Sequence, residues 1–165
     1  MYFAKYVVST NAWTTSKLAS GPSNRMFHTT TSNGTHLHLF GGISAATAVG
    51  GTTYNDFWIY DVKGNTWINM TNAEGNRPSA RYGHSAQIYG DGNLLLIMGG
   101  FGSDDKAIST NIDIYAYSMP YNKWTTLYFA VSTLFDSTTN VVTFKLHGWG
   151  FSNPTNGEVS YTYRK

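Results

Sequence analysis

The chain has 165 residues, of which 41% are hydrophobic and 16% aromatic, so it can fill the core of about one domain. Its formal net charge is +2, only 12% of its residues are charged, and no run of Lys or Arg occurs, so we expect no nucleic-acid partner. No stretch approaches the roughly 20 apolar residues of a membrane-spanning helix, and the absence of cysteine excludes disulfides and thiolate metal sites.

The first predicted element is a pair of strands in residues 1–18. Within it, Trp13 follows Tyr6 at a distance of seven residues. The same spacing recurs further along the chain, first between Tyr60 and Trp67 and then between Tyr117 and Trp124. Because a fixed spacing that recurs at long intervals is typical of repeat architectures, we expect residues 1–18 to be the last two strands, c and d, of a repeat unit.

The next two elements are complete repeat units, in residues 19–70 and 71–127. Pro22, Arg25 and His28 of the first unit return 56 residues later, as Pro78, Arg81 and His84 of the second. In each unit an apolar run then ends in two glycines, Gly41–Gly42 and Gly99–Gly100. These signals predict four short strands, a to d, in each unit and no helix.

Residues 128–165 look like a degenerate and incomplete third unit. Ser132 and Phe135 stand where the first two units have Arg and His, and Trp149 replaces the second glycine. The segment Glu158–Arg164 resembles strand c, so we expect this unit to stop before strand d.

The order of Pro, Arg and His, an apolar strand, two glycines, Tyr and Trp resembles the kelch repeat. The resemblance is close over residues 19–127 and weak elsewhere. It implies an all-β fold, a kelch-type β-propeller segment of four-stranded antiparallel blades. It also implies a module without catalytic residues or cofactor that mediates protein–protein interaction.

Two complete and two partial blades are too few for a closed ring of about four to eight. The sequence therefore predicts either a fragment of a longer propeller or association with further copies of the chain. In both cases, another blade is needed to complete the ring.

The resemblance places partner docking on the loops that join strands b to c and d to a. The b–c loops are predicted at 43–54 and 101–110, and the d–a loops at 19–24 and 71–79. Asp104, Asp105 and Lys106 give the second b–c loop its charges, and we take them as candidate docking residues. The alternative is that these loops are only solvated connections.

Arg25 and Arg81 are further candidates, because the matching arginine of some kelch proteins reaches an acidic peptide. A guanidinium group suits carboxylate recognition. The alternative is an internal role, in which each arginine binds backbone carbonyls or a neighbouring blade.

Four histidines raise the question of a metal site. His28 and His84 occupy equivalent positions of different units, whereas His36 and His38 lie two residues apart on one predicted strand. Repetition at equivalent positions favours packing, so we expect no metal.

An enzyme is the alternative function class. Kelch-like propellers also occur in copper radical oxidases that resemble galactose oxidase, but those need a cysteine cross-linked to a tyrosine. The chain has no cysteine. An extracellular carbohydrate-acting or oxidase protein would therefore need catalytic residues outside this chain. A carbohydrate-binding propeller would depend on exposed aromatic residues such as Trp149, and the sequons at Asn33 and Asn69 leave a secretory setting open.

Overall fold

The structure is a computed structural model, and it describes residues 2–18, 20–45, 51–108, 113–136, 141–149 and 158–164. The described residues form β-strands and one short 3-10 helix, η1 (Val8–Thr10), so the expected all-β class is confirmed. Within these residues, no helix is long and apolar enough to cross a membrane.

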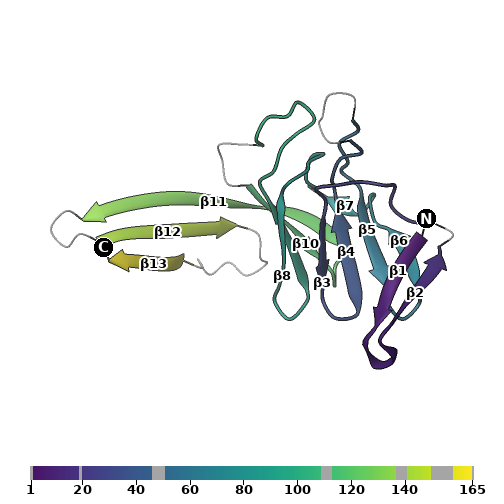
Figure 1. Ribbon diagram of the computed structural model, residues 1–165. Coiled ribbons are helices and arrows are strands. Elements are labelled where there is room, and N and C mark those ends of the chain that lie inside the picture. Colours follow the sequence, from purple (N-terminus) through teal and green to yellow (C-terminus); the bar gives the residue numbers. More distant parts are fainter. Residues whose placement is uncertain are drawn as a thin grey trace.

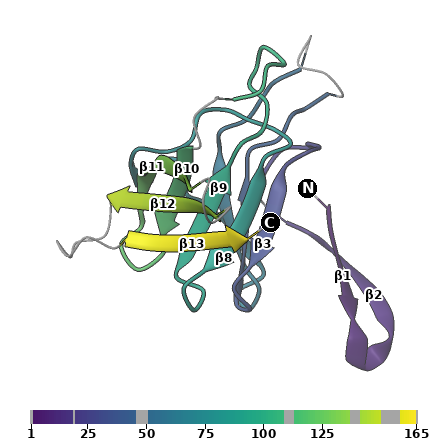
Figure 2. The same cartoon turned by 90° about the vertical axis from the view of Figure 1, so that its left-hand side faces the viewer.

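The chain begins with an antiparallel hairpin, β1 (Tyr2–Val7) and β2 (Ala12–Lys17), which Figure 1 shows at one end of the molecule. Tyr6 lies opposite Trp13, with ring centroids 5.3 Å apart. In Figure 2 the hairpin stands apart from the other strands. That its two strands are c and d of a preceding blade stays a prediction.

The first complete unit, which we call blade 1, is a four-stranded antiparallel sheet. Its strands are paired in chain order and are β3 (Thr29–Ser32), β4 (His36–Phe40), β5 (Phe57–Asp61) and β6 (Thr66–Asn69). The alternation of apolar and polar residues and the glycines after β4 set this arrangement.

The second unit, blade 2, repeats the arrangement with β8 (Ser85–Tyr89), β9 (Leu94–Met98), β10 (Asp113–Ser118) and the first part of β11 (Lys123–Asp136). The linker between the blades adds a short strand, β7 (Glu74–Gly75), parallel to the start of β11. A Cβ atom at Gly75 would lie 2.0 Å from the Trp124 carbonyl oxygen, so this pairing requires glycine.

Strand β11 continues beyond blade 2 to Asp136 and pairs with β12 (Val141–Trp149), which in turn pairs with β13 (Glu158–Arg164). Figure 1 shows these strands as an arm that extends away from the blades. The positions of Ser132 and Phe135 lie inside β11. A separate incomplete blade at 128–165 stays a prediction, as do the boundaries at 18, 70 and 127.

The core lies between the two blades. Trp124 of blade 2 is only 1% exposed, and its ring packs against Phe40 and Phe57 of blade 1, with centroids 5.7 and 5.3 Å apart. Tyr117 completes the contact, at 4.7 Å from Phe57. The aromatic pair of blade 2 is thus buried against strands b and c of the preceding blade.

The three repeated tryptophans differ in burial. Trp124, which packs against blade 1, is 1% exposed, and Trp67, which packs with Leu18, Leu39 and Tyr60, is 9% exposed. Trp13, which no described blade precedes, is 70% exposed. The fold therefore leaves the aromatic face of the hairpin open.

An asparagine in each turn between strands c and d is bonded to the tyrosine of the aromatic pair. Tyr60 and Tyr117 donate hydrogen bonds from their hydroxyls to the Oδ1 atoms of Asn65 and Asn122, each at 2.5 Å. Both asparagines are left-handed, with φ 51°. Tyr6 and Asn11 make the same bond in the hairpin. Asparagine tolerates this conformation better than most residues, which explains its place in the turn.

Candidate functional site

The connections between strands b and c fold back onto the start of strand a in both blades. Ile43 bridges Met26 and Thr53 in blade 1, and Phe101 bridges Tyr82 and Ala107 in blade 2. We call the surface formed by residues 20–28, 41–45, 51–56, 70–84 and 99–108 the loop face.

A row of aromatic rings, exposed at both ends and partly buried in the middle, crosses the loop face from one blade to the other. The rings of Phe27 and Tyr82 have centroids 6.2 Å apart, and those of Tyr82 and Phe101 stack at 5.6 Å with their planes inclined by 25°. Phe27 is 55% exposed, Phe101 is 43% exposed, and Met26 beside them is 40% exposed. We call the rings of Phe27, Tyr82 and Phe101 the aromatic row.

The backbone fixes each member of the row. Phe101 and Tyr82 exchange both backbone hydrogen bonds, at 2.9 and 3.0 Å, and the Gly83 N–H donates to the Phe27 carbonyl at 2.9 Å. Phe27 has a φ of 55°, a left-handed conformation that is a true outlier for a bulky residue. The row is therefore held in place before any ligand binds.

The candidate residues Asp104, Asp105 and Lys106 lie at the Phe101 end of the row. The Tyr82 hydroxyl donates a hydrogen bond to the Asp105 carboxylate. Asp104 forms an exposed ion pair with Lys106, with 3.6 Å between the charged atoms. The Lys106 backbone N–H is the main cause of a lowered pKa of Asp104, so this carboxylate is charged at neutral pH.

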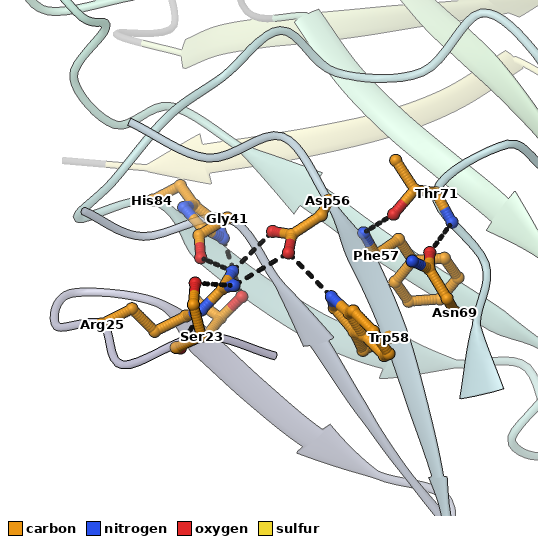
Figure 3. Close-up of polar contacts among 10 residues, drawn as sticks. Ser23, Arg25, Gly41, Asp56, Phe57, Trp58, Asn69, Thr71 and His84 are labelled. Atoms are coloured by element: carbon orange, nitrogen blue, oxygen red, sulfur yellow. Dashed lines mark hydrogen bonds and ion pairs between the residues drawn. The ribbon is translucent and has the colours of Figure 1, made fainter. Parts of the chain in front are cut away.

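The guanidinium group of Arg25 points toward Asp56 and the Gly41 carbonyl (Figure 3). Its side chain is 3% exposed, and its guanidinium donates to both carboxylate oxygens of Asp56, at 2.5 and 2.8 Å, and to the Gly41 carbonyl at 2.9 Å. The same carboxylate accepts the Trp58 indole N–H at 2.7 Å. The Tyr54 ring covers the guanidinium at 4.2 Å.

Arg81 has the equivalent position in blade 2 and is 1% exposed. Its guanidinium donates to the Gly99 carbonyl at 3.0 Å and to the Ser79 carbonyl and hydroxyl at 3.2 Å. The Tyr115 ring lies 5.0 Å from it. The backbone carbonyl of Arg81 accepts a hydrogen bond from the Gly42 N–H at 2.8 Å, and this bond joins the two blades.

The structure thus separates the sequence-derived candidates into two groups. Asp104, Asp105 and Lys106 lie together on the exposed loop face, whereas Arg25 and Arg81 are buried and bonded to their own blades. Docking at any of these residues stays a prediction. The contacts of both arginines correspond to the alternative internal role, in which each arginine binds backbone carbonyls or a neighbouring blade.

His84 is packed between the blades. Its Nε2 lies 2.7 Å from the Thr29 hydroxyl, and its ring meets Phe40 edge-on at 5.5 Å. Burial, aided by the nearby Arg81 and His28, lowers the pKa of His84 to about 4. His28 keeps part of its surface in solvent. Desolvation of the covered part, and then the nearby charge of Arg25, lower the pKa of His28 as well.

His38 lies in the same interblade layer and is 2% exposed. Burial and the neighbouring His36 lower its pKa to about 4. Across the described ranges, no three His, Asp or Glu side chains lie close enough together to hold a metal ion.

The sequence did not predict the aromatic row. Met26 and Phe27 occupy the two positions between Arg25 and His28, and Tyr82 occupies the corresponding place in blade 2. Apolar residues in a loop just before a polar strand were the available signal. The side chain of Trp149 lies outside the described part of the structure.

Comparison with known proteins gives both a family match and individual relatives. A sequence model of the KLHDC2/KLHL20/DRC7 Kelch-repeats domain matches residues 2–144. A probable serine/threonine-protein kinase of Dictyostelium discoideum is 36% identical over 97 residues, which are 57% of this chain and 7% of that protein.

Two further relatives match about the same share of the chain. The dynein alpha chain of the flagellar outer arm of Chlamydomonas reinhardtii is 33% identical over 99 residues, 54% of this chain and 2% of that protein. A kelch repeat-containing protein of Arthroderma benhamiae is 28% identical over 97 residues, 59% of this chain and 14% of that protein. The chain thus spans only a small part of each of these relatives.

Proposed function

The chain belongs to the kelch-repeat family, and from this premise we propose that it docks a protein partner on its loop face. Kelch repeats generally serve as protein-interaction modules. The finer proposal is that docking uses the connections between strands b and c and between strands d and a, and that the chain itself carries no catalytic residue.

The observation that carries this proposal is the exposed aromatic row. Aromatic residues are enriched at protein interfaces, where their rings supply large contact areas at a low cost in conformational entropy. Rings that serve only the core would be covered, as Phe40, Phe57 and Trp124 are. Phe27 and Phe101 instead leave about half of their surfaces in solvent.

The matched relatives add support of another kind. A protein named as a kinase and one named as a dynein alpha chain share with this chain a segment that is 7% or less of their length. A segment common to proteins of such different names suits a role in binding better than a role in one reaction.

The test is selection of peptides from a displayed library of short random sequences on the immobilised chain. We expect peptides to be enriched on the wild type and to be lost on a Tyr82→Ala/Phe101→Ala variant. Tyr121→Ala is the matched control, because Tyr121 is 82% exposed but lies in the turn between β10 and β11, away from the loop face. Enrichment that is absent, or unaffected by the double substitution, would refute docking at this face.

A second proposal concerns the open face of the hairpin. We propose that a further blade covers Tyr6 and Trp13, as blade 1 covers Tyr117 and Trp124. Among copies of this chain, we propose the far face of blade 2 as the covering surface, because Leu94, Leu96 and Met98 are partly exposed there. A Cβ atom at Gly99 would meet nothing within 4 Å, whereas one at the equivalent Gly41 would lie 2.6 Å from the Arg81 carbonyl oxygen of the next blade.

A further inference from the structure

We infer that the loop face binds an extended peptide segment whose alternate side chains are apolar and are followed by a Lys or Arg. The apolar side chains lie on the aromatic row, and the basic one reaches Asp104 and Asp105. This inference rests on the proposed docking function and assigns its ligand chemistry.

The spacing of the row fits an extended chain. Successive rings lie 6.2 and 5.6 Å apart, from Phe27 to Tyr82 and from Tyr82 to Phe101. Alternate residues of an extended chain are roughly 6.5 Å apart and point to the same side. One extended peptide can therefore place an apolar side chain on each successive ring.

The charge at one end of the row favours a basic residue. Asp104 and Asp105 are both exposed, and Lys106 is the only cation beside them within the described loop. The ion pair of Lys106 with Asp104 has side chains that are 82% and 59% exposed, so exchanging Lys106 for a ligand cation costs little.

The two repeated arginines do not present their guanidinium groups to an acidic ligand, and the exposed Lys106 is paired with Asp104. The guanidinium groups of Arg25 and Arg81 are covered by their own blades and are already bonded to Asp56, Ser79 and the carbonyls after strand b. Binding a ligand carboxylate would require these internal bonds to break. The arginines thus shape the loops, and the exposed groups decide which ligand binds.

Phe27 sets the apolar end of the site. Its equivalent in blade 2 is Gly83, which has almost the same φ and no side chain. A phenylalanine at this position adds a half-exposed ring beside Tyr82 and Met26 without filling the core. It therefore lengthens the row by one ring, and the bound peptide by one contact.

The test is the composition of the peptides selected from the random library. On the wild type we expect enrichment of alternating apolar residues and of a Lys or Arg on one side of them. On an Asp104→Asn/Asp105→Asn variant we expect the basic preference to disappear, with at least a fivefold loss of affinity for the selected basic peptides, on the order of one charge-assisted contact. Phe27→Gly should shorten the apolar pattern and leave the melting temperature unchanged or higher.

The outcomes separate this inference from the proposed function. Selected peptides that are acidic or uncharged, yet depend on Tyr82 and Phe101, would overturn the ligand chemistry and leave loop-face docking intact. A basic preference that survives in the Asp104→Asn/Asp105→Asn variant would also overturn it. If no enrichment depends on Tyr82 and Phe101, both proposals fail.

Discussion

Phe27 and Gly83 hold the same position of the repeat and the same left-handed backbone conformation, with φ angles of 55° and 61°. Glycine adopts this conformation freely, but another residue loses roughly 1 to 3 kcal/mol by it. Because the Phe27 ring is 55% exposed, its burial returns little of that cost. The protein therefore keeps an exposed ring at the expense of stability, which is expected of a binding residue.

Replacing Phe27 by glycine should not destabilise the fold. The relief of backbone strain is partly offset by the greater freedom of glycine in the unfolded chain, so we expect the free energy of unfolding to rise by about 0 to 1 kcal/mol. Urea denaturation measures this change. The control is Phe101→Gly, at a position without positive φ, which should lose about 1 kcal/mol or more. A loss of more than about 2 kcal/mol in Phe27→Gly would identify Phe27 as a structural residue.

The three repeated tryptophans should differ in stability cost according to their burial. Trp124→Ala and Trp67→Ala should each lower the free energy of unfolding by roughly 3 to 5 kcal/mol, because both rings are buried. Trp13→Ala removes a ring that is 70% exposed and should cost less than about 1 kcal/mol. Equal losses at the three positions, in urea or heat denaturation, would contradict the interblade core.

The arginine that binds Asp56 should be needed for folding. Arg25→Ala leaves the Asp56 carboxylate without its bidentate partner, and we expect a loss of roughly 2 to 4 kcal/mol in denaturation experiments. Lys106→Ala, which removes a cation whose side chain is 82% exposed, should change stability by less than about 0.5 kcal/mol. An Arg25→Ala variant that is fully stable but no longer binds the selected peptides would show that Arg25 belongs to the docking surface.

Acid should destabilise the fold through the buried histidines. Burial lowers the pKa of His38 from 6.5 to about 4, so the folded form stays neutral while the unfolded chain takes up a proton. The contribution of His38 is complete above about pH 6.5 and is lost as the pH falls toward 4. His38→Leu, which copies Leu96 of blade 2, should flatten the slope of stability against pH in this range. His84 behaves in the same way, so some slope should remain.

An unchanged pH slope in His38→Leu would show that His38 is accessible to protons in the folded chain. The measurement is a series of urea denaturations between pH 7 and pH 4.

Association of copies can be tested with single cysteines, because the chain has none of its own. Trp124 contacts Phe40, so the repeat predicts that Trp13 of one copy contacts Met98 of another. Mixing Trp13→Cys with Met98→Cys under mild oxidation should give a mixed disulfide dimer in preference to either homodimer. Tyr121→Cys, exposed but on neither face, is the control partner for both. Equal yields in all mixtures would contradict association through these faces.

The blades were predictable because each repeated residue has one mechanical role. The paired glycines end strand b where the next blade approaches, and the Tyr and Trp of each unit fill the space between blades. The course of β11 was not predictable in this way. Residues 123–136 contain neither glycine nor proline, so no local signal shows where the strand ends.

The site was only partly predictable. The charges of Asp104, Asp105 and Lys106 could be predicted as a feature of the site, because the other residues of the loop are uncharged. The aromatic row joins Phe27 to Tyr82 and Phe101, which are far apart in sequence and meet only when the blades pack. The sequence did not show whether Arg25 and Arg81 point toward a ligand or into the molecule, because a guanidinium group binds a ligand carboxylate and an internal one such as Asp56 equally well.

The most direct test of the account is the affinity of the best selected peptide for the wild type and for Tyr82→Ala, measured by calorimetric titration. Tyr82 is the middle ring of the row, in contact with both Phe27 and Phe101. We predict a loss of about tenfold or more in affinity with a folded, cooperatively melting variant. An unchanged affinity would contradict the claim that the aromatic row is the docking surface.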